Sequence, residues 1–445
     1  MTLSLTFQRA RLSRAAGRCL LIGATMLAPA HAAGTAEAGQ AERAERAAQA
    51  ARVRDVARPA TGAGTAPWAT SPSGTPVSAR GVATLPDAWL LGSGQPWHER
   101  VPARASAPAL RSRAPTAAEA ELIQRLEALL PRIDGRVMVL VAEGRIVDAI
   151  GTGGIDFSTR LLSASMAKTV TALAVGQALC AGKLTLETRA DTLVPALAGT
   201  ALGEATLRDL LRMASGTLEP PPGDVMGTTA QESRLHLEGA GNLEQLVASP
   251  SQSTAESMGG VRVRPGERFS YKARDPYTVA LMLERATGMP ATRWIDEQLL
   301  AALPNSQLAI LGTDRTGRFA GANGSVRLAL IDWVRLAQHV QARRGEDSCY
   351  GRYLRELSST QIAAPMLPGV NGYFRGYGYF TWTENRLAPD TFWAVGYGGQ
   401  RIGWSTDPAN TRIFLMFGNA ADRHMQEVYP LAREWISMGS GRLTP

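Results

Sequence analysis

A serine and a lysine stand three residues apart in this chain, at Ser165 and Lys168. The chain contains 44 arginines but only three lysines, so a lysine at this position raises a chemical question. Arginine stays protonated in proteins, whereas a desolvated lysine can lose its proton and act as a base. Because positions i and i+3 share a helix face, Lys168 Nζ can reach Ser165 Oγ. The pair has the chemistry of a nucleophile and its base, and its alternative is an ordinary surface pair on a helix.

The residues around this pair predict a rigid support. Residues 161–181 predict a helix that ends at Gly182, and the residues that lead into Ser165, 158–164, are loop-like. Ser165 would then lie in the first turn, where free backbone N–H groups and the helix dipole favour a developing negative charge. The rest of the helix is nearly all apolar, so we expect it to run through the core and fix its first turn.

A tyrosine stands on a second segment of interest. Residues 264–270 contain a turn that leads into Tyr271, and a helix with an Asp275 cap follows and stops at Gly288. A tyrosine on such a loop can reach a site between two lobes. An ordinary half-buried tyrosine is the commoner fate of a lone Tyr and stays the alternative.

A glycine-rich strand end forms the third segment, Gly396-Tyr397-Gly398-Gly399. Small residues within a strand pattern let a ligand approach the backbone closely. An exposed N–H group there can stabilise an oxyanion. The alternative is a glycine-rich turn without a ligand.

Together these segments resemble the serine β-lactamase and penicillin-binding protein superfamily. The nearest branch contains class C β-lactamases, related esterases and 6-aminohexanoate-dimer hydrolases. That family shows S-x-x-K, then Y-x-N or Y-x-S about 100 residues later, then a strand with K-T-G or H-x-G; here Tyr271 follows Ser165 by 106 residues. Residues 205–217 (ATLRDLLRMASGT), 265–288 and 396–402 also resemble the family's flanking segments, so the likeness covers roughly residues 115–437.

The resemblance implies roles for the residues that match these motifs. Ser165 would be the nucleophile that forms an acyl-enzyme, and Lys168 its base. Tyr271 would pass the proton to the leaving group and activate the water that hydrolyses the acyl-enzyme. The N–H groups of Ser165 and Gly399 would form the oxyanion hole. The family's chemistry implies no metal and no organic cofactor.

Two departures from the family pattern bear on the substrate. The Asn or Ser of the tyrosine motif is Ala273 here, and the K-T or H position is Gly396-Tyr397. Tyr397 and Gly398 would therefore contact the substrate without the lysine that holds the carboxylate of a β-lactam. The pattern favours a hydrolase of esters or small amides. A β-lactamase, a DD-peptidase (penicillin-binding protein) and a catalytically silent binding protein of the same fold are the alternatives.

The order of the predicted elements indicates the fold class. Helices are predicted at 118–130, 206–213, 275–286, 326–343 and 423–437, and strands at 137–142, 145–150, 373–383, 392–396, 401–406 and 412–418. Glu143-Gly144 predicts a hairpin between the first two strands. Because strands at both ends of the chain must pair to bury their faces, we expect an α+β fold of the β-lactamase/DD-peptidase type, with a mostly antiparallel sheet flanked by terminal helices and a helical lobe.

The beginning of the chain predicts export. Residues 1–32 have a basic start, a short apolar run and an A-x-A site ending at Ala32, which is the pattern of a signal peptide. The apolar run is too short for the alternative, a membrane anchor. Residues 33–100 are rich in Ala, Arg, Pro and Gly and predict a disordered leader. Residues 101–445 would form the hydrolase domain, with an α/β part at about 115–190 and 365–440 and a helical lobe at about 191–364.

The composition of the chain limits the kinds of molecule that the protein is expected to bind. Loss of residues 1–32 removes four arginines and no acid, so the formal charge falls from +8 to +4, too little for a nucleic-acid-binding footprint. No later run reaches transmembrane length, so we expect a secreted or periplasmic protein with a small-molecule substrate and no membrane span. HExxH, CxxC and GxSxG motifs are absent from the sequence. Cys180 lies in an apolar helix pattern and predicts a buried free thiol, although export permits a disulfide with Cys349. The oligomeric state is not indicated.

Overall fold

The computed structural model describes residues 53–55, 98–104, 109–217, 242–248, 263–303, 307–365, 372–420 and 422–438. They all belong to one compact unit that spans Arg46–Pro445. The predicted signal peptide, residues 1–32, lies outside the described residues. Among the described residues, no helix combines the length and the apolar character that crossing a bilayer requires.

Two short strands fall in or at the end of the range predicted as a disordered leader, residues 33–100. β1 (Val53–Asp55) pairs in parallel with β4 (Arg145–Gly151), and β2 (His98–Val101) pairs antiparallel with β6 (Ala309–Gly312). The other residues of this range are outside the described ones. An edge strand gains its place through backbone hydrogen bonds, which a composition poor in large apolar residues does not reveal.

A nine-stranded sheet carries the fold, in the order β1-β4-β3-β13-β12-β11-β10-β9-β8. The strands not yet bounded are β3 (Gly135–Ala142), β8 (Ile362–Ala363), β9 (Phe374–Tyr377), β10 (Trp382–Asn385), β11 (Thr391–Gly396), β12 (Gln400–Ser405) and β13 (Ile413–Gly418). β3 pairs antiparallel with β13, so strands from the two ends of the chain meet in the middle of the sheet. The predicted α+β fold with a mostly antiparallel sheet is confirmed, and only β1 joins it in parallel.

The predicted hairpin is also present. β3 and β4 are antiparallel neighbours joined by Glu143 and Gly144, which both have left-handed backbone angles (φ 55° and 68°). Two left-handed residues in a row are the geometry that matches the twist of a tight hairpin, and a glycine adopts it without steric cost.

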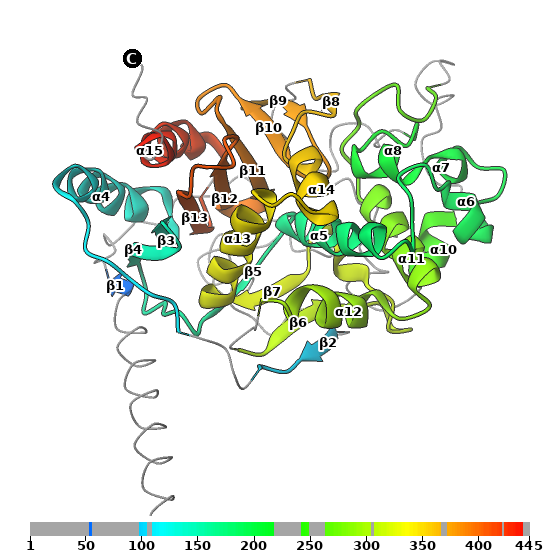
Figure 1. The fold of residues 1–445 in the computed structure, drawn as a ribbon, viewed down its shortest axis with the longest axis horizontal. Helices are drawn as coiled ribbons and strands as arrows, with labels where there is room; N and C mark the ends of the chain where they lie inside the picture. Colours follow the sequence, from blue (N-terminus) through cyan, green and yellow to red (C-terminus); the bar gives the residue numbers. More distant parts are fainter. Residues whose placement is uncertain are drawn as a thin grey trace, which may run out of the picture. The chain divides into compact units, whose positions relative to one another are not determined.

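Helices cover both faces of the sheet (Figure 1). α4 (Ala117–Leu129) and α15 (Met425–Ser437) contact each other on one side, where α15 packs on β12 and β13. On the other side α13 (Leu330–Arg344) contacts β13, and α5 (Met166–Cys180) contacts β11. The other α-helices of the described residues are α6 (Ala190–Leu193), α7 (Ala201–Glu204), α8 (Leu207–Leu211), α10 (Leu243–Ala248), α11 (Arg274–Thr287), α12 (Ala291–Trp294) and α14 (Cys349–Leu357).

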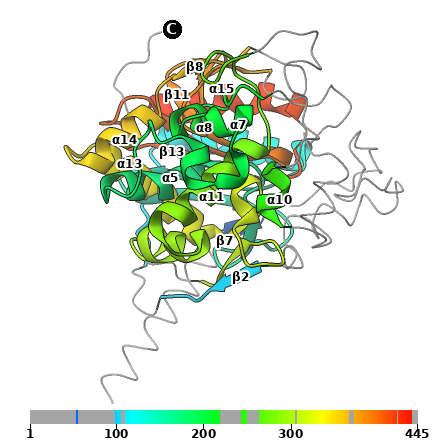
Figure 2. The ribbon, with the colours of Figure 1, turned by 90° about the vertical axis from the view of Figure 1, so that its right-hand side faces the viewer.

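α5 is a core helix, as its composition predicts. It is buried along most of its length and contacts α11, α14 and β11. Figures 1 and 2 place α5 beside α11, with β7 (Val326–Ala329) below them in both views. A helix enclosed in this way has little freedom to move its first turn.

A second sheet takes two of its strands, β6 and β7, from the predicted helical lobe, and it corrects two helix predictions. Its four strands follow the order β2-β6-β7-β5, where β5 is Arg160–Leu162. The helix predicted over 161–181 therefore begins only at Met166, and the helix predicted over 326–343 begins at Leu330 after β7. Both strands are short apolar runs that suit a strand or a buried helix equally, and the pairing of β5 with β7 decides between them.

Cys180 and Cys349 form a disulfide, with their Cα atoms 5.8 Å apart, so the predicted free thiol is wrong. The bond joins the end of α5 to the start of α14. These helices approach closely because Gly176 on α5 faces Tyr353 on α14, where any side chain on the glycine would clash with the ring. The sequence could not reveal this proximity, since the two cysteines are 169 residues apart.

Replacing both cysteines with alanine is expected to lower the free energy of unfolding by about 2–5 kcal/mol, because the cross-link restricts a very long loop in the unfolded chain. Guanidinium denaturation of the oxidised protein and of the double variant measures the difference. Reduced wild-type protein should behave like the variant, and the variant should not respond to reductant. Equal midpoints for oxidised wild type and variant would contradict the cross-link.

Candidate active site

Ser165 stands in a sharp turn between a strand and a helix. It is the N-cap of α5 with φ −63° and ψ −7°, and its side chain makes no capping bond to the helix. Ala164 before it has φ +42°, an uncommon value for a residue with a side chain. Ser163 is fixed by Val326 of β7, whose carbonyl receives the Ser163 N–H at 2.8 Å and whose N–H donates to Ser163 Oγ at 3.1 Å. The turn presents Ser165 half-buried, with its hydroxyl not used for capping.

Lys168 contacts this hydroxyl from the next turn of α5. Its Nζ lies 3.0 Å from Ser165 Oγ and 2.8 Å from the backbone oxygen of Asn323. The lysine is only 2% exposed. A buried amine within hydrogen-bond reach of a serine hydroxyl is the arrangement that a lysine base needs.

No motif in the sequence indicated the Asn323 contact. Asn323 ends the short helix η5 (Ala320–Asn323), and the atom that receives Lys168 Nζ is a backbone oxygen. Backbone acceptors carry no residue-type signal, so only the fold identifies them.

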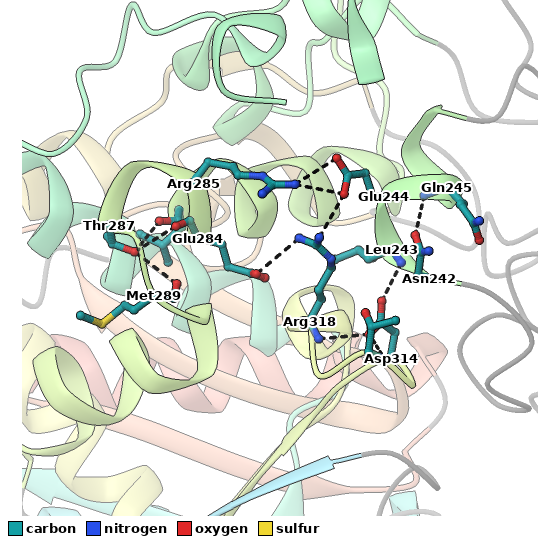
Figure 3. A network of polar contacts seen from close by, with 12 residues as sticks. Asn242, Leu243, Glu244, Gln245, Glu284, Arg285, Thr287, Met289, Asp314 and Arg318 are labelled. Atoms are coloured by element: carbon teal, nitrogen blue, oxygen red, sulfur yellow. Dashed lines mark hydrogen bonds and ion pairs between the residues drawn. The ribbon is translucent and has the colours of Figure 1, made fainter. Parts of the chain in front are cut away.

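A network of charged groups fixes the segment that leads to η5 (Figure 3). Arg318 pairs with Glu244 of α10 at 3.1 Å and with Glu284 of α11 at 3.6 Å. Asp314 receives the backbone N–H groups of Arg318 at 3.0 Å and of Leu243 at 2.7 Å. Burial raises the pKa of Glu284 to about 7. The network ties α10 and α11 to the loop that presents the Asn323 oxygen.

Tyr271 comes to the same place from the loop before α11. Lys168 Nζ lies 4.9 Å from the centroid of the Tyr271 ring. The ring packs on Trp382 at 5.4 Å and on the edge of Tyr377 at 6.3 Å. The loop itself is held by Met213, whose carbonyl receives the Ser270 N–H at 2.8 Å. The structure thus brings Ser165, Lys168 and Tyr271 together, although 106 residues separate the first from the last.

The predicted Asp275 cap of the following helix is wrong. α11 begins at Arg274 with Ala273 as its N-cap, which puts Asp275 inside the first turn and fully buried. Its carboxylate accepts a hydrogen bond from Ser215 and faces Lys272. The predicted end at Gly288 is confirmed, since Gly288 takes the left-handed angle of a helix C-cap.

The glycine-rich segment forms the corner between β11 and β12, beside the serine turn. Gly396 packs so closely that any side chain on it would clash with the carbonyl oxygen of Ser163. Gly398 (φ 77°) and Gly399 (φ 87°) both have left-handed angles, which favour glycine. The corner therefore lies directly against the residues that lead into Ser165.

Gln400 fixes the shape of this corner and was missed by the sequence reasoning. Its fully buried side chain donates to the Tyr397 carbonyl at 2.7 Å and to the Gly418 carbonyl at 3.0 Å, and accepts from the Gly418 N–H at 2.9 Å. A polar residue between a glycine turn and an apolar strand was the available signal. Tyr397 at the tip of the corner is 36% exposed, while the aromatic residues around Tyr271 are buried packing.

No group of three or more His, Cys, Asp or Glu side chains that could hold a metal ion lies within the described ranges. Lys168 Nζ lies within hydrogen-bond reach of Ser165 Oγ. The arrangement can support attack by a serine oxygen, with a buried amine as proton acceptor and a phenol ring beside both.

Known proteins resemble this chain in sequence or in structure. The β-lactamase family model matches residues 122–434, and no curated protein matches. A Bacillus anthracis protein assigned as a 6-aminohexanoate-dimer hydrolase has a similar structure, with a TM-score of 0.63 and 17% identity over 78% of this chain and 92% of that one. EstCE1, a hydrolase with promiscuous acyltransferase activity, has a similar structure with a TM-score of 0.56 and 15% sequence identity. The match covers 72% of this chain and 100% of EstCE1. A penicillin-binding protein from Bacillus halodurans has a TM-score of 0.51 and 16% sequence identity, and the match covers 69% of this chain and 98% of that protein. At these identities the structural likeness shows the fold.

Proposed function

The chain belongs to the β-lactamase family, and from this premise we propose that it is a serine hydrolase that cleaves esters or small amides through an acyl-serine intermediate. The observation that carries the proposal is the buried Lys168 amine, 3.0 Å from Ser165 Oγ. Such a contact lets the amine accept the hydroxyl proton as the oxygen attacks a carbonyl carbon.

The proposed mechanism assigns a role to each of the converging groups. Lys168 takes the proton of Ser165, and the N–H groups of Ser165 and Gly399 stabilise the oxyanion that forms. Tyr271 passes a proton to the leaving group, which departs and leaves the acyl-serine. Tyr271 then activates a water molecule that hydrolyses the acyl-serine and restores the Ser165 hydroxyl.

The corner of β11 and β12 favours a substrate without a carboxylate. The family's lysine position is Gly396, which has no room for a side chain because of the Ser163 carbonyl. Tyr397 offers an uncharged, partly exposed ring instead, and Gly398 gives the substrate access to the backbone. A missing charge-assisted hydrogen bond costs about 1.5–3 kcal/mol, or roughly 10- to 100-fold in rate. This argues for an ester or small-amide hydrolase over a β-lactamase or DD-peptidase.

We also propose that the protein is secreted or periplasmic, with cleavage near Ala32. The Cys180–Cys349 disulfide favours an oxidising compartment, where such bonds persist.

A labelling experiment and a substrate panel test the proposed function. A fluorophosphonate should label wild-type protein at Ser165, as located by peptide mass spectrometry. A p-nitrophenyl short-chain ester should be hydrolysed with a kcat/KM about 10- to 100-fold above that for nitrocefin, because the contact for a carboxylate is missing. A protein that does not label would be the silent binding protein. Acylation of Ser165 by penicillin with rapid turnover would establish the β-lactamase alternative.

A further inference from the structure

A second buried lysine follows Tyr271 in the chain. Lys272 is 3% exposed, and its Nζ lies 2.8 Å from the backbone oxygen of Ser270 and 3.4 Å from Asp275 Oδ2. Two of the three lysines of the chain, Lys168 and Lys272, are therefore buried next to the same tyrosine. The proposed mechanism uses only the first of them.

The Lys272 side chain connects the backbone on the two sides of Tyr271. Ser270 precedes the tyrosine and Lys272 follows it, so one ammonium group links the backbone before Tyr271 to the residue after it. A lysine is a compact point charge that suits this short reach, whereas the planar fork of an arginine needs more space. The contact restricts the backbone angles that aim the phenol.

Asp275 connects this loop to a second segment. Ser215 Oγ donates to Asp275 Oδ1 at 2.7 Å and lies 3.0 Å from Thr217 Oγ1. The same segment receives the Ser270 N–H on the Met213 carbonyl. Backbone and side-chain contacts therefore join the loop to residues 213–217, and the side chains of Ser215, Thr217 and Asp275 are buried.

The Asp275 carboxyl group is ionised at neutral pH. Burial raises the pKa of Asp275 to about 6, although Lys272 and Ser215 oppose the rise. Above that pH the carboxylate faces the Lys272 ammonium. A buried ion pair of this kind is a weak source of stability, because desolvation offsets its attraction and apolar replacements are often equally stable. Stability alone is thus a poor explanation for it.

We propose that Lys272 and Asp275 are positioning residues that hold the Tyr271 phenol beside Lys168 and Ser165. The inference rests on the proposed function, since it concerns the proton transfers assigned to Tyr271. In the family pattern a polar Asn or Ser follows the tyrosine by two positions, and here that position is Ala273, whose side chain offers no hydrogen bond. The Lys272–Asp275 pair supplies buried polar contacts on the same loop, which Ala273 cannot make.

A charge-neutral double variant tests this inference. Lys272→Met with Asp275→Asn removes both charges together and keeps an acceptor for Ser215, so the thermal midpoint should stay close to that of wild type. Fluorophosphonate labelling of Ser165 should keep its rate, because fluoride leaves without a proton from Tyr271. Steady-state turnover of the p-nitrophenyl ester should fall about 10- to 100-fold, because a displaced phenol no longer activates water, and a burst of nitrophenolate should precede it.

Other outcomes of this experiment overturn the inference in distinguishable ways. A folded double variant with wild-type turnover would make the pair merely structural, and slower labelling would mean that it acts on Ser165 and Lys168 instead. A wild type that does not label would overturn the proposed function and this inference with it.

A milder variant covers the case in which the double variant does not fold. Ser215→Ala removes the bond to Asp275 together with the weaker contact to Thr217, and should reduce turnover several-fold with labelling unchanged; unchanged turnover would again overturn the inference. Thr287→Ala is the matched control, because it also deletes a hydroxyl hydrogen bond but at the opposite end of α11, about 18 Å from Asp275 along the helix.

Discussion

Ser165→Ala is expected to lower kcat/KM for a chromogenic short-chain ester by about 10⁴-fold or more, because the Ser165 oxygen forms the acyl bond. The variant should keep its thermal stability. Ser165 is the N-cap of α5 but makes no capping hydrogen bond, so alanine does not remove the stabilisation that a capping serine usually gives. Steady-state kinetics and a thermal melt of the same preparation measure both effects.

The control for this variant is Ser158→Ala, an exposed serine shortly before the same turn, whose hydroxyl donates to Asp156. It should retain wild-type kinetics. EDTA is expected to leave the wild-type rate unchanged, because the proposed mechanism uses no metal. An undiminished rate in Ser165→Ala would eliminate the acyl-serine mechanism.

The sequence was sufficient to identify the residues that converge. The S-x-x-K spacing places Ser165 and Lys168 one turn apart on a helix, and this local geometry follows from the chain itself. Tyr271 was found through the family pattern, since no local rule connects positions 106 residues apart. The structure adds the reason for the convergence, which is that Met213 and Trp382 hold the tyrosine loop against α5.

The features that the sequence did not predict depend on contacts between distant segments. The Asn323 carbonyl, the Gln400 side chain and the Cys180–Cys349 bond all act on partners that only the fold brings near. The same limit explains the strands β5 and β7, because a short buried apolar run becomes a strand or a helix according to its neighbours. Aspartate is common at helix caps, so the sequence predicts a cap at Asp275, whereas burial beside Lys272 sets its place.

Lys168 variants can separate a base from a fixed positive charge. Lys168→Arg keeps the charge but cannot lose a proton, and Lys168→Met keeps the length without a charge or a proton acceptor. If Lys168 is the base, both variants should lower kcat/KM by about 10³-fold and slow fluorophosphonate labelling similarly. If only its charge mattered, arginine would retain most of the activity and methionine would not, so the arginine variant decides between the two roles.

The Lys168→Met variant is expected to stay folded, so a loss of its rate would report on the reaction and not on unfolding. Lys168 is buried against Ser165 Oγ and the Asn323 carbonyl, so methionine removes a polar group that is costly to bury and should leave the thermal midpoint equal or higher. Lys183→Met is the matched control, because it removes the exposed lysine shortly after α5 and should change neither rate nor midpoint. Together with the buried Lys272, these variants cover every lysine of the chain. A Lys168→Met protein that is stable, folded and fully active would show that the buried amine takes no part in the reaction.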